Sequence, residues 1–332
     1  MNSTPRTVMK NLALKRFLTL AALALLSTFG SIAGTLYPVE VGDRWGFINK
    51  DGELVINPQF DRADRFASDR AAVQIGRQWG YVDTSGKILV NPQFKNAAAF
   101  SGGLAAVELG GLYGYVNTDG KYVINPQFDT AGPFSDNRAV VKLKRRYGYI
   151  SPDGKLIINP QFESADNFSE GLAAIELGNQ WGFVDPSGKI VINPQFDQAM
   201  AFSGSLAAIK LARRWGFVDK SGKIVINPQF EAVGAFVKGL APAQIGDRWG
   251  YIDITGKIVI NPQFEEADPF AEDRARVKLA RRWGYINKEG KYVINPQFDD
   301  AEPFADGLAR VKLSRKYGYI DNNGRIVWNP TN

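Results

Sequence analysis

The residue types that most often carry out catalysis are scarce in this chain. It has no histidine and no cysteine, which removes the usual nucleophile–base pairs and the commonest metal ligands. Adjacent carboxylates, Glu265-Glu266 and Asp299-Asp300, are of the kind a glycosidase uses, but an acidic residue recurs at this place along the chain. We predict that the protein is not an enzyme and has no catalytic residue, no metal site and no cofactor. A glycan-active enzyme is the third alternative.

A catalytic site in a repetitive chain should stand out as a departure from the repeat. The departures are Lys95, which stands at an otherwise acidic position, Met200, Pro242 and Trp328. These residue types do not combine into a reactive set. They therefore leave the prediction of a non-enzymatic protein unchanged.

Basic residues form a pattern that does vary between copies. Before the recurring Trp or Tyr, five copies have Glu or Gln, an apolar residue and Gly, whereas four have Lys-Leu-x-Arg followed by Arg or Lys. If the copies stack in register, the dibasic pairs line one rim and form a candidate site for an anionic partner. A solvated turn or descent from a two-copy duplication is the alternative. The rim residues are Arg145, Arg146, Arg213, Arg214, Arg281, Arg282, Arg315 and Lys316.

These patterns belong to a repeat of 34 residues that occurs nine times without an insertion. Its marks are Trp-Gly or Tyr-Gly, a turn glycine such as Gly52, and Asn-Pro-Gln-Phe, which first begins at Asn57. Because periodic aromatic residues are most often buried, we expect the Trp or Tyr position to form the structural core of the repeat. This position is Trp45, Trp79, Tyr113, Tyr147, Trp181, Trp215, Trp249, Trp283 and Tyr317.

The residue order within one repeat predicts three strands. Glycine and proline recur too often to leave room for two helices. Residues 308–313 alternate apolar and polar, residues 317–321 form a second strand, and residues 325–328 form a third after a turn at Gly324. A connector that carries two recurring phenylalanines, such as Phe298 and Phe304, joins one meander to the next.

Both faces of the predicted meander are apolar, since Trp283 and Tyr285 point one way and Ile286 the other. Such a sheet has to be covered on both sides, which neighbouring repeats achieve by stacking. We therefore predict an all-β protein of nine three-stranded meanders in a propeller-like toroid, with an open β-solenoid as the alternative. No strand from one end of the chain is expected to complete a sheet at the other end and latch the ring.

These residues resemble the bacterial WG repeat, also called the KWG repeat. The resemblance rests on residues 282–298, with Phe304 and residues 307–309 behind them, and it extends over about residues 36–332. Tyr replaces Trp in three copies, and Asn-Pro-Gln-Phe replaces a more Pro-rich turn. The resemblance implies a β-rich repeat domain of exported or multidomain bacterial proteins, and it implies no catalytic residues.

The first 33 residues differ from the rest of the chain. Four basic residues precede an apolar run over residues 17–29, and small residues follow at 31–33, which is the order of a secretory signal peptide. We predict a signal peptide over residues 1–33, a repeat domain over residues 34–332, and export to the periplasm or outside the cell. An uncleaved anchor is the alternative, because residues 17–33 are apolar. No membrane span is expected after cleavage.

Charge limits the kinds of partner. Removing the four basic residues of the leader from the 40 in the chain leaves 36 against 34 acidic residues, a net charge of +2. A chain so near neutrality does not favour a nucleic-acid partner. We predict a binding or scaffold surface for an unidentified protein or polysaccharide of the cell envelope or the exterior. A purely structural envelope element is the alternative.

Overall fold

The structure of the protein is a computed structural model that describes residues 35–331. The signal peptide predicted for residues 1–33 lies outside this part of the chain. The described residues form strands joined by short turns, and they contain no helix that is long and apolar enough to cross a membrane.

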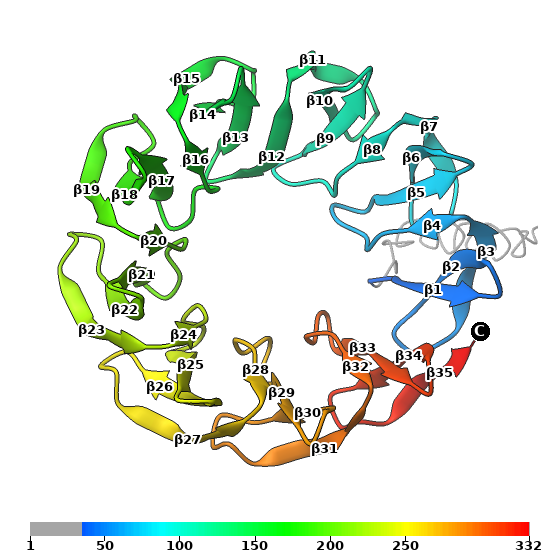
Figure 1. Ribbon diagram of the computed structural model, residues 1–332. Coiled ribbons are helices and arrows are strands. Elements are labelled where there is room, and N and C mark those ends of the chain that lie inside the picture. Colours follow the sequence, from blue (N-terminus) through cyan, green and yellow to red (C-terminus); the bar gives the residue numbers. More distant parts are fainter. Residues whose placement is uncertain (1–34, 332) are drawn as a thin grey trace, which may run out of the picture. The chain divides into compact units, whose positions relative to one another are not determined.

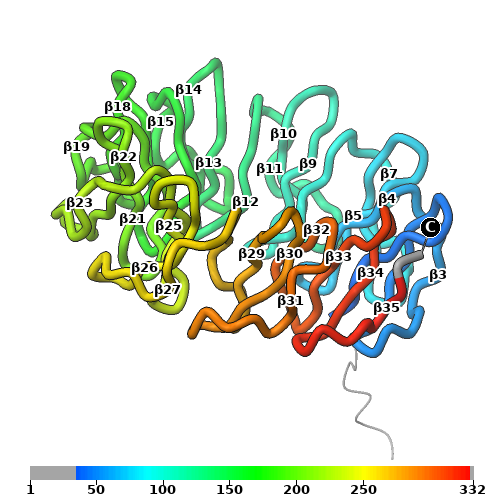
Figure 2. The backbone as a smooth tube through the Cα atoms, turned by 60° about the horizontal axis from the view of Figure 1, so that its bottom comes forward, coloured from blue at the N-terminus to red at the C-terminus, as the bar shows by residue number. Residues whose placement is uncertain are grey.

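The strands form nine antiparallel sheets, each built from strands that follow one another in the chain. Figure 1 shows these sheets as nine blades around a ring, with the last strand of each blade on the outer perimeter. Figure 2 shows the first and the last blade side by side. Residues 35–331 therefore form a nine-bladed β-propeller, which confirms the predicted toroid over the open solenoid.

The blades are numbered along the chain, and their strands run from the centre of the ring outward. The first blade consists of β1 (Tyr37–Val41), β2 (Arg44–Ile48) and β3 (Leu54–Phe60). In the other blades the innermost strands are β4 (Arg62–Ala63), β8 (Asn96–Ala97), β12 (Thr130–Ser135), β16 (Ser164–Ala165), β20 (Gln198–Ala199), β24 (Ala232–Val233), β28 (Glu266–Ala267) and β32 (Asp300–Ala301). The second strands are β5 (Ala71–Ile75), β9 (Leu104–Leu109), β13 (Arg138–Leu143), β17 (Ala173–Leu177), β21 (Ala207–Leu211), β25 (Leu240–Ile245), β29 (Ala275–Leu279) and β33 (Leu308–Leu313).

The third strands of these blades are β6 (Gln78–Val82), β10 (Leu112–Asn117), β14 (Arg146–Ile150), β18 (Gln180–Val184), β22 (Arg214–Val218), β26 (Arg248–Asp253), β30 (Arg282–Ile286) and β34 (Lys316–Asp321). The outermost strands are β7 (Ile88–Phe94), β11 (Tyr122–Phe128), β15 (Leu156–Phe162), β19 (Ile190–Phe196), β23 (Ile224–Phe230), β27 (Ile258–Phe264), β31 (Tyr292–Phe298) and β35 (Ile326–Thr331).

Eight blades have one strand more than the sequence predicts. The connector between repeats adds it, because it pairs antiparallel with the next inner strand: in the second blade Arg62 lies opposite Gln74 and Ala63 opposite Val73. A pair of residues is too short to show an alternating pattern, so periodicity alone does not reveal it. The first blade keeps the predicted three strands.

The Trp-Gly or Tyr-Gly mark meets the Asn-Pro-Gln-Phe mark at a bulge in the first eight blades. In the eighth blade, the register of β30 and β31 shifts between Trp283 and Tyr285, and the outermost strand continues through the proline. A proline is tolerated there because the strand is at the edge of its sheet. A Cβ on Gly284 would lie 2.6 Å from the carbonyl oxygen of Ile294 and 2.6 Å from the nitrogen of Pro296. Glycine is therefore required at this position, because the bulged backbone of the neighbouring strand passes too close for a Cβ.

The core lies between blades, as expected for sheets that are apolar on both faces. Nine clusters of buried side chains each combine residues of two neighbouring blades. One of them joins Tyr37, Val39 and Ile48 of the first blade to Leu308 and Tyr319 of the ninth. This junction, called the seam below, closes the ring by packing.

Candidate functional site

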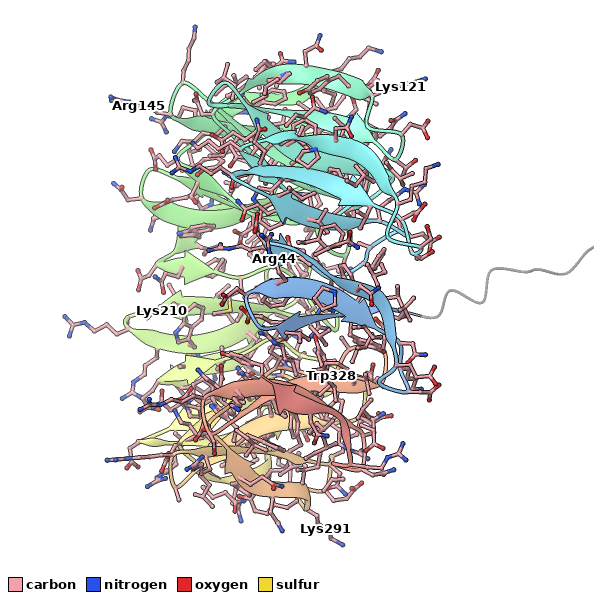
Figure 3. The ribbon with its side chains drawn as sticks, turned by 90° about the vertical axis from the view of Figure 1, so that its right-hand side faces the viewer. Arg44, Lys121, Arg145, Lys210, Lys291 and Trp328 are labelled. Atoms are coloured by element: carbon pink, nitrogen blue, oxygen red, sulfur yellow. The ribbon has the colours of Figure 1, made fainter. Side chains whose placement is uncertain are left out.

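The basic rim lies at the turns that join the second and third strands of the blades. In Figure 3, where the ring is seen edge-on, Arg145 and Lys210 project from one face and Lys121 lies toward the other side. The structure divides the basic residues of this region into three groups with different surroundings.

The lysine that opens each basic motif lies on the aromatic ring opposite it in the sheet. Lys142, for example, faces Tyr147 across the β13–β14 pair, and its Nζ is 5.0 Å from the centre of that ring. The corresponding distances are 5.6 Å for Lys210 over Trp215, 5.3 Å for Lys278 over Trp283 and 5.0 Å for Lys312 over Tyr317. These cations are engaged within their own blade.

Three of the rim arginines form ion pairs with the acidic residue that follows Gln-Phe. Arg146 lies 3.1 Å from Glu163, and Arg214 and Arg282 pair in the same way with Glu231 and Asp299. The hydrogen bond from Arg214 holds the pKa of Glu231 below its ordinary value. These three arginines are therefore less available to a partner than the sequence suggests.

The remaining rim arginines occupy the turn tips in an unfavourable backbone conformation. Both residues of each turn have positive φ: 48° and 73° for Lys144 and Arg145, and 48° and 71° for Ala212 and Arg213. The same holds for the turns that end in Arg281 and Arg315. The other five copies begin this turn with a glycine, which adopts positive φ without strain. Within residues 35–331, none of the four arginine side chains has a hydrogen bond or ion pair, and all are exposed.

The predicted core position is only partly buried. Trp215 and Trp283 are 8% and 6% exposed, whereas the other seven residues at this position are half-buried. The ring two residues further along the strand is the fully enclosed one, as with Phe217 at 1% and Tyr285 at 0%. The two positions differ in burial because the Trp or Tyr is only one residue from the turn. Its side chain therefore lies near the face of the propeller.

The departures from the repeat do not converge on one site. Lys95 forms an ion pair of 2.8 Å with the buried Glu108 and lowers the pKa of that carboxyl. Met200 and Trp328 pack against two different core clusters, and Pro242 lies in β25. In the part of the chain that the structure describes, no three acidic side chains group closely enough to hold a metal ion.

A cavity at the seam was not predicted from the sequence. It has a volume of about 730 Å³ and is lined by the first, second, third and ninth blades. Trp45 and Arg310 lie in its wall, with the Arg310 guanidinium 5.2 Å from the Trp45 ring, and Arg65 pairs with Glu302 at 2.8 Å. These residues are far apart in the chain, so no local pattern brings them together.

Comparison with solved structures agrees with the fold. One similar chain, described as the eukaryotic initiation factor, has a TM-score of 0.65 at 10% identity, covering 88% of this chain and 94% of that one. Another, the dihydro-heme d1 dehydrogenase NirN, has a TM-score of 0.46 at 15% identity, covering 80% of this chain and 74% of that one. At such identities the first likeness shows the propeller fold alone. No curated protein matches the sequence.

Comparison with protein families is more specific. The model of the WG containing repeat matches eight times and covers most of the described residues. The matched segments are residues 45–77, 79–113, 113–145, 147–181, 181–212, 215–249, 249–280 and 283–317. The chain therefore belongs to the family of the WG containing repeat.

Proposed function

We propose that this protein is an exported, non-enzymatic binding scaffold, and that the four turn arginines form its contact surface for an acidic polysaccharide of the envelope or the exterior. They are Arg145, Arg213, Arg281 and Arg315, in the fourth, sixth, eighth and ninth blades.

The observation that carries the proposal is the combination of strain and lack of partners at these turns. A residue other than glycine at positive φ costs roughly 1 kcal/mol or more, and each turn has two such residues. Within residues 35–331 the four arginine side chains form no hydrogen bond or ion pair in return. Strained turns of this kind are typical of sites that serve binding rather than stability.

The other basic residues of the rim support the same surface less directly. Arg146, Arg214 and Arg282 are held by ion pairs on the blade surface. Exposed pairs of this kind contribute up to about 1 kcal/mol, so a polyanion can displace the acidic partner. A purely structural element, in contrast, gains nothing from four unpartnered arginines on strained turns.

The test is a variant that carries Gln at Arg145, Arg213, Arg281 and Arg315. Its matched control carries Gln at four exposed lysines that follow the turn glycine, Lys87, Lys121, Lys189 and Lys223, which changes the net charge equally. Binding to alginate, a carboxylated polysaccharide, is measured at several salt concentrations. We expect the arginine variant to lose affinity and salt dependence, because exposed charges act mainly within about 8 Å at physiological ionic strength. Equal losses in both variants would contradict the assignment.

Export is tested on protein purified from its native cells. The intact mass should correspond to a chain that begins near Gly34, in a fraction outside the cytoplasm. A mass that retains Met1 would refute cleavage.

A further inference from the structure

A second cavity lies beside the connectors of the fourth and fifth blades. Their strands, β12 and β16, are on the inner side of the ring in Figure 1. The cavity has a volume of about 450 Å³, a size typical of sites for small molecules or single side chains. Its wall includes Ser135 of the fourth blade and three consecutive residues of the fifth, Asp166, Asn167 and Phe168. The cavity is therefore separate from both the seam and the turn arginines.

The carboxylate of Asp166 has no cation to balance it. Its side chain is half-buried, and within residues 35–331 it forms no hydrogen bond or ion pair. Burial raises the pKa of this carboxyl above its ordinary value, and no neighbouring charge offsets the effect. A carboxylate that is partly removed from water without a partner lowers the stability of the folded state. A cation that binds from outside the chain would remove this cost.

The same position is acidic in the eighth and ninth blades, and there the chain supplies the cation itself. Asp268 forms an ion pair of 2.5 Å with Arg276, and Glu302 forms one of 3.5 Å with Arg310. Both arginines come from the second strand of the same blade. In the fifth blade the residue at that place is Ala174. The fifth blade thus keeps the carboxylate of the pair and lacks its arginine.

Backbone hydrogen bonds fix the acidic residue in the same way in these blades. The amide of Asp166 donates to the carbonyl of Ala174 at 2.9 Å, and its carbonyl accepts from the Tyr149 hydroxyl at 2.7 Å. Asp268 makes the same two hydrogen bonds, at 3.0 and 2.8 Å. The position of the acidic residue is therefore set before any ligand arrives, which lowers the entropy cost of binding.

Two further acceptors in the cavity wall lack a donor in the part of the chain that the structure describes. The side-chain oxygen of Asn167 is buried and has no hydrogen-bond partner. The hydroxyl of Ser101 donates to the carbonyl of Phe134 in the next connector at 2.6 Å, but Ser135 makes no such bond to Phe168. Residues 166–168 thus each have an acceptor without a donor.

We propose that this cavity binds the guanidinium group of an arginine, either the free amino acid or a side chain of a partner protein. The eighth blade shows the contacts, since Arg276 donates to the carboxylate of Asp268 and to the carbonyl of Ala301. A guanidinium holds several N–H donors in a planar fork and is always charged. It therefore fits a carboxylate that is accompanied by neutral acceptors better than an ammonium, which is a compact point charge.

The test uses the full chain and ligand-observed NMR titration. The probes are L-arginine and the peptide acetyl-Gly-Arg-Gly-amide, and the controls are the same two molecules with citrulline, whose urea group is neutral and has nearly the same shape. We expect one saturable site for arginine and none for citrulline. Binding of the free amino acid would identify it as sufficient, whereas binding of the peptide alone would point to a side chain of a partner protein.

Two variants separate the site from general attraction to acidic groups. Asp166→Asn keeps the shape of the side chain and should weaken arginine binding by about tenfold or more, the range of a hydrogen bond to a charged group. Without ligand this variant should melt at a higher temperature, because it removes a half-buried charge. Asp197→Asn is the control, since Asp197 is exposed and has no ion pair within residues 35–331. It should bind arginine as the wild type does.

Ala174→Arg supplies the cation from within the chain, as in the eighth blade. We expect this variant to melt at a higher temperature than the wild type and to bind no added arginine. If it does not fold, the comparison of Asp166→Asn with Asp197→Asn still decides. The proposal is overturned if neither arginine probe binds, if citrulline binds equally well, or if Asp166→Asn binds as the wild type does. It does not rest on the arginine surface, so alginate binding should not change in Asp166→Asn.

Discussion

The seam and an interior junction join the same kind of blade by different means. Between the eighth and ninth blades, a covalent connector supplies a strand, a ring at 4.8 Å from Tyr285 and an acceptor for its hydroxyl. At the seam Tyr37 supplies the ring, and Pro38 supplies the acceptor for Tyr319. The Tyr37 hydroxyl also donates to the carbonyl of Asp306 at 2.5 Å. Two neighbouring residues thus replace two contacts of the connector, but they do not replace its strand.

Within residues 35–331 the ring therefore closes by side-chain packing, without a strand that crosses from one end to the other. The core is continuous across the seam, since one of the nine clusters lies there, so burial closes the ring as it does elsewhere. Within residues 35–331 the first blade has three strands, and the cavity lies beside its innermost strand, β1. We expect substitutions in the core to lower stability equally at an interior junction and at the seam. Substitutions around the cavity should affect the two kinds of junction differently.

The largest expected effect compares a tryptophan in an interior junction with one at the cavity. Trp215→Ala should destabilise the protein by about 3–5 kcal/mol, because its ring is buried in a core cluster. Trp45→Ala should cost roughly half as much, since its half-buried ring borders the cavity. Chemical denaturation of both variants measures the difference. Equal losses would mean that the cavity does not weaken packing at the seam.

A second comparison uses the turn glycine, which has a φ of 83° in both the first and ninth blades. A Cβ on Gly324 would lie 3.1 Å from a side-chain carbon of Ile294, whereas one on Gly52 would overlap the carbonyl oxygen of Val327 across the seam. Gly324→Ala should cost about 1 kcal/mol from the left-handed conformation alone. Gly52→Ala should cost about 1–3 kcal/mol more, because backbone has to move. Melting temperatures that match would contradict close contact at the seam.

Most of the fold could be predicted because it follows from local periodicity. The 34-residue spacing predicts the number of repeats, the strands of each meander and the turn at Gly324. The connector strand, which is two residues long in seven of its eight copies, is too short to show such a period. The sequence predicts that Trp45 and its equivalents face the core, but alternation gives the face of a side chain and not its distance from the end of the strand, so it does not show that seven of these nine rings are only half-buried.

The candidate site was less predictable because it depends on contacts between distant residues. In the sequence the eight rim residues look equivalent. In the structure Arg146, Arg214 and Arg282 form ion pairs with acidic residues, whereas the turn arginines are exposed. Ring closure leaves one signal in the sequence: Tyr37 stands where the other copies have alanine. That departure marks the seam, but only packing shows that its ring replaces a phenylalanine.

The hydroxyl of Tyr37 gives a smaller effect that depends on pH. Tyr37→Phe keeps the ring and removes the hydrogen bond to Asp306, so it should cost about 0.5–1.5 kcal/mol at neutral pH. Burial raises the pKa of Tyr37 to about 12, and the charges of Asp306 and Glu272 add to this. The folded state thus favours the neutral phenol, so its contribution is complete below pH 10 and is lost as the pH rises toward 12.

Denaturation at several pH values measures this contribution. Between pH 10 and 12, wild-type stability should fall more steeply than that of Tyr37→Phe, by at most about 1.4 kcal/mol per pH unit. The other buried tyrosines titrate in both proteins and cancel in the difference. Parallel pH profiles would show that Tyr37 is not buried at the seam.

The smallest expected effect concerns the ion pair that crosses the seam. Arg65 of the second blade lies 2.8 Å from Glu302 of the ninth, with side chains 37% and 38% exposed. Arg310 also lies 3.5 Å from Glu302, so Arg65→Gln does not leave that carboxylate alone. The loss should be below about 1 kcal/mol, as for other exposed pairs.

Salt distinguishes this pair from its counterpart in an interior blade. The Debye length falls from about 10 Å at 0.1 M salt to about 3 Å at 1 M, so the effect of Arg65→Gln should disappear at 1 M sodium chloride. Arg276→Gln is the control, because Arg276 binds Asp268 at 2.5 Å and lies 4.1 Å from the Trp283 ring with its side chain only 21% exposed. Its larger loss should persist in salt, since packing and a shielded pair are little screened. If Arg65→Gln also kept its full effect at 1 M, the ion pair at the seam would be as enclosed as the interior one.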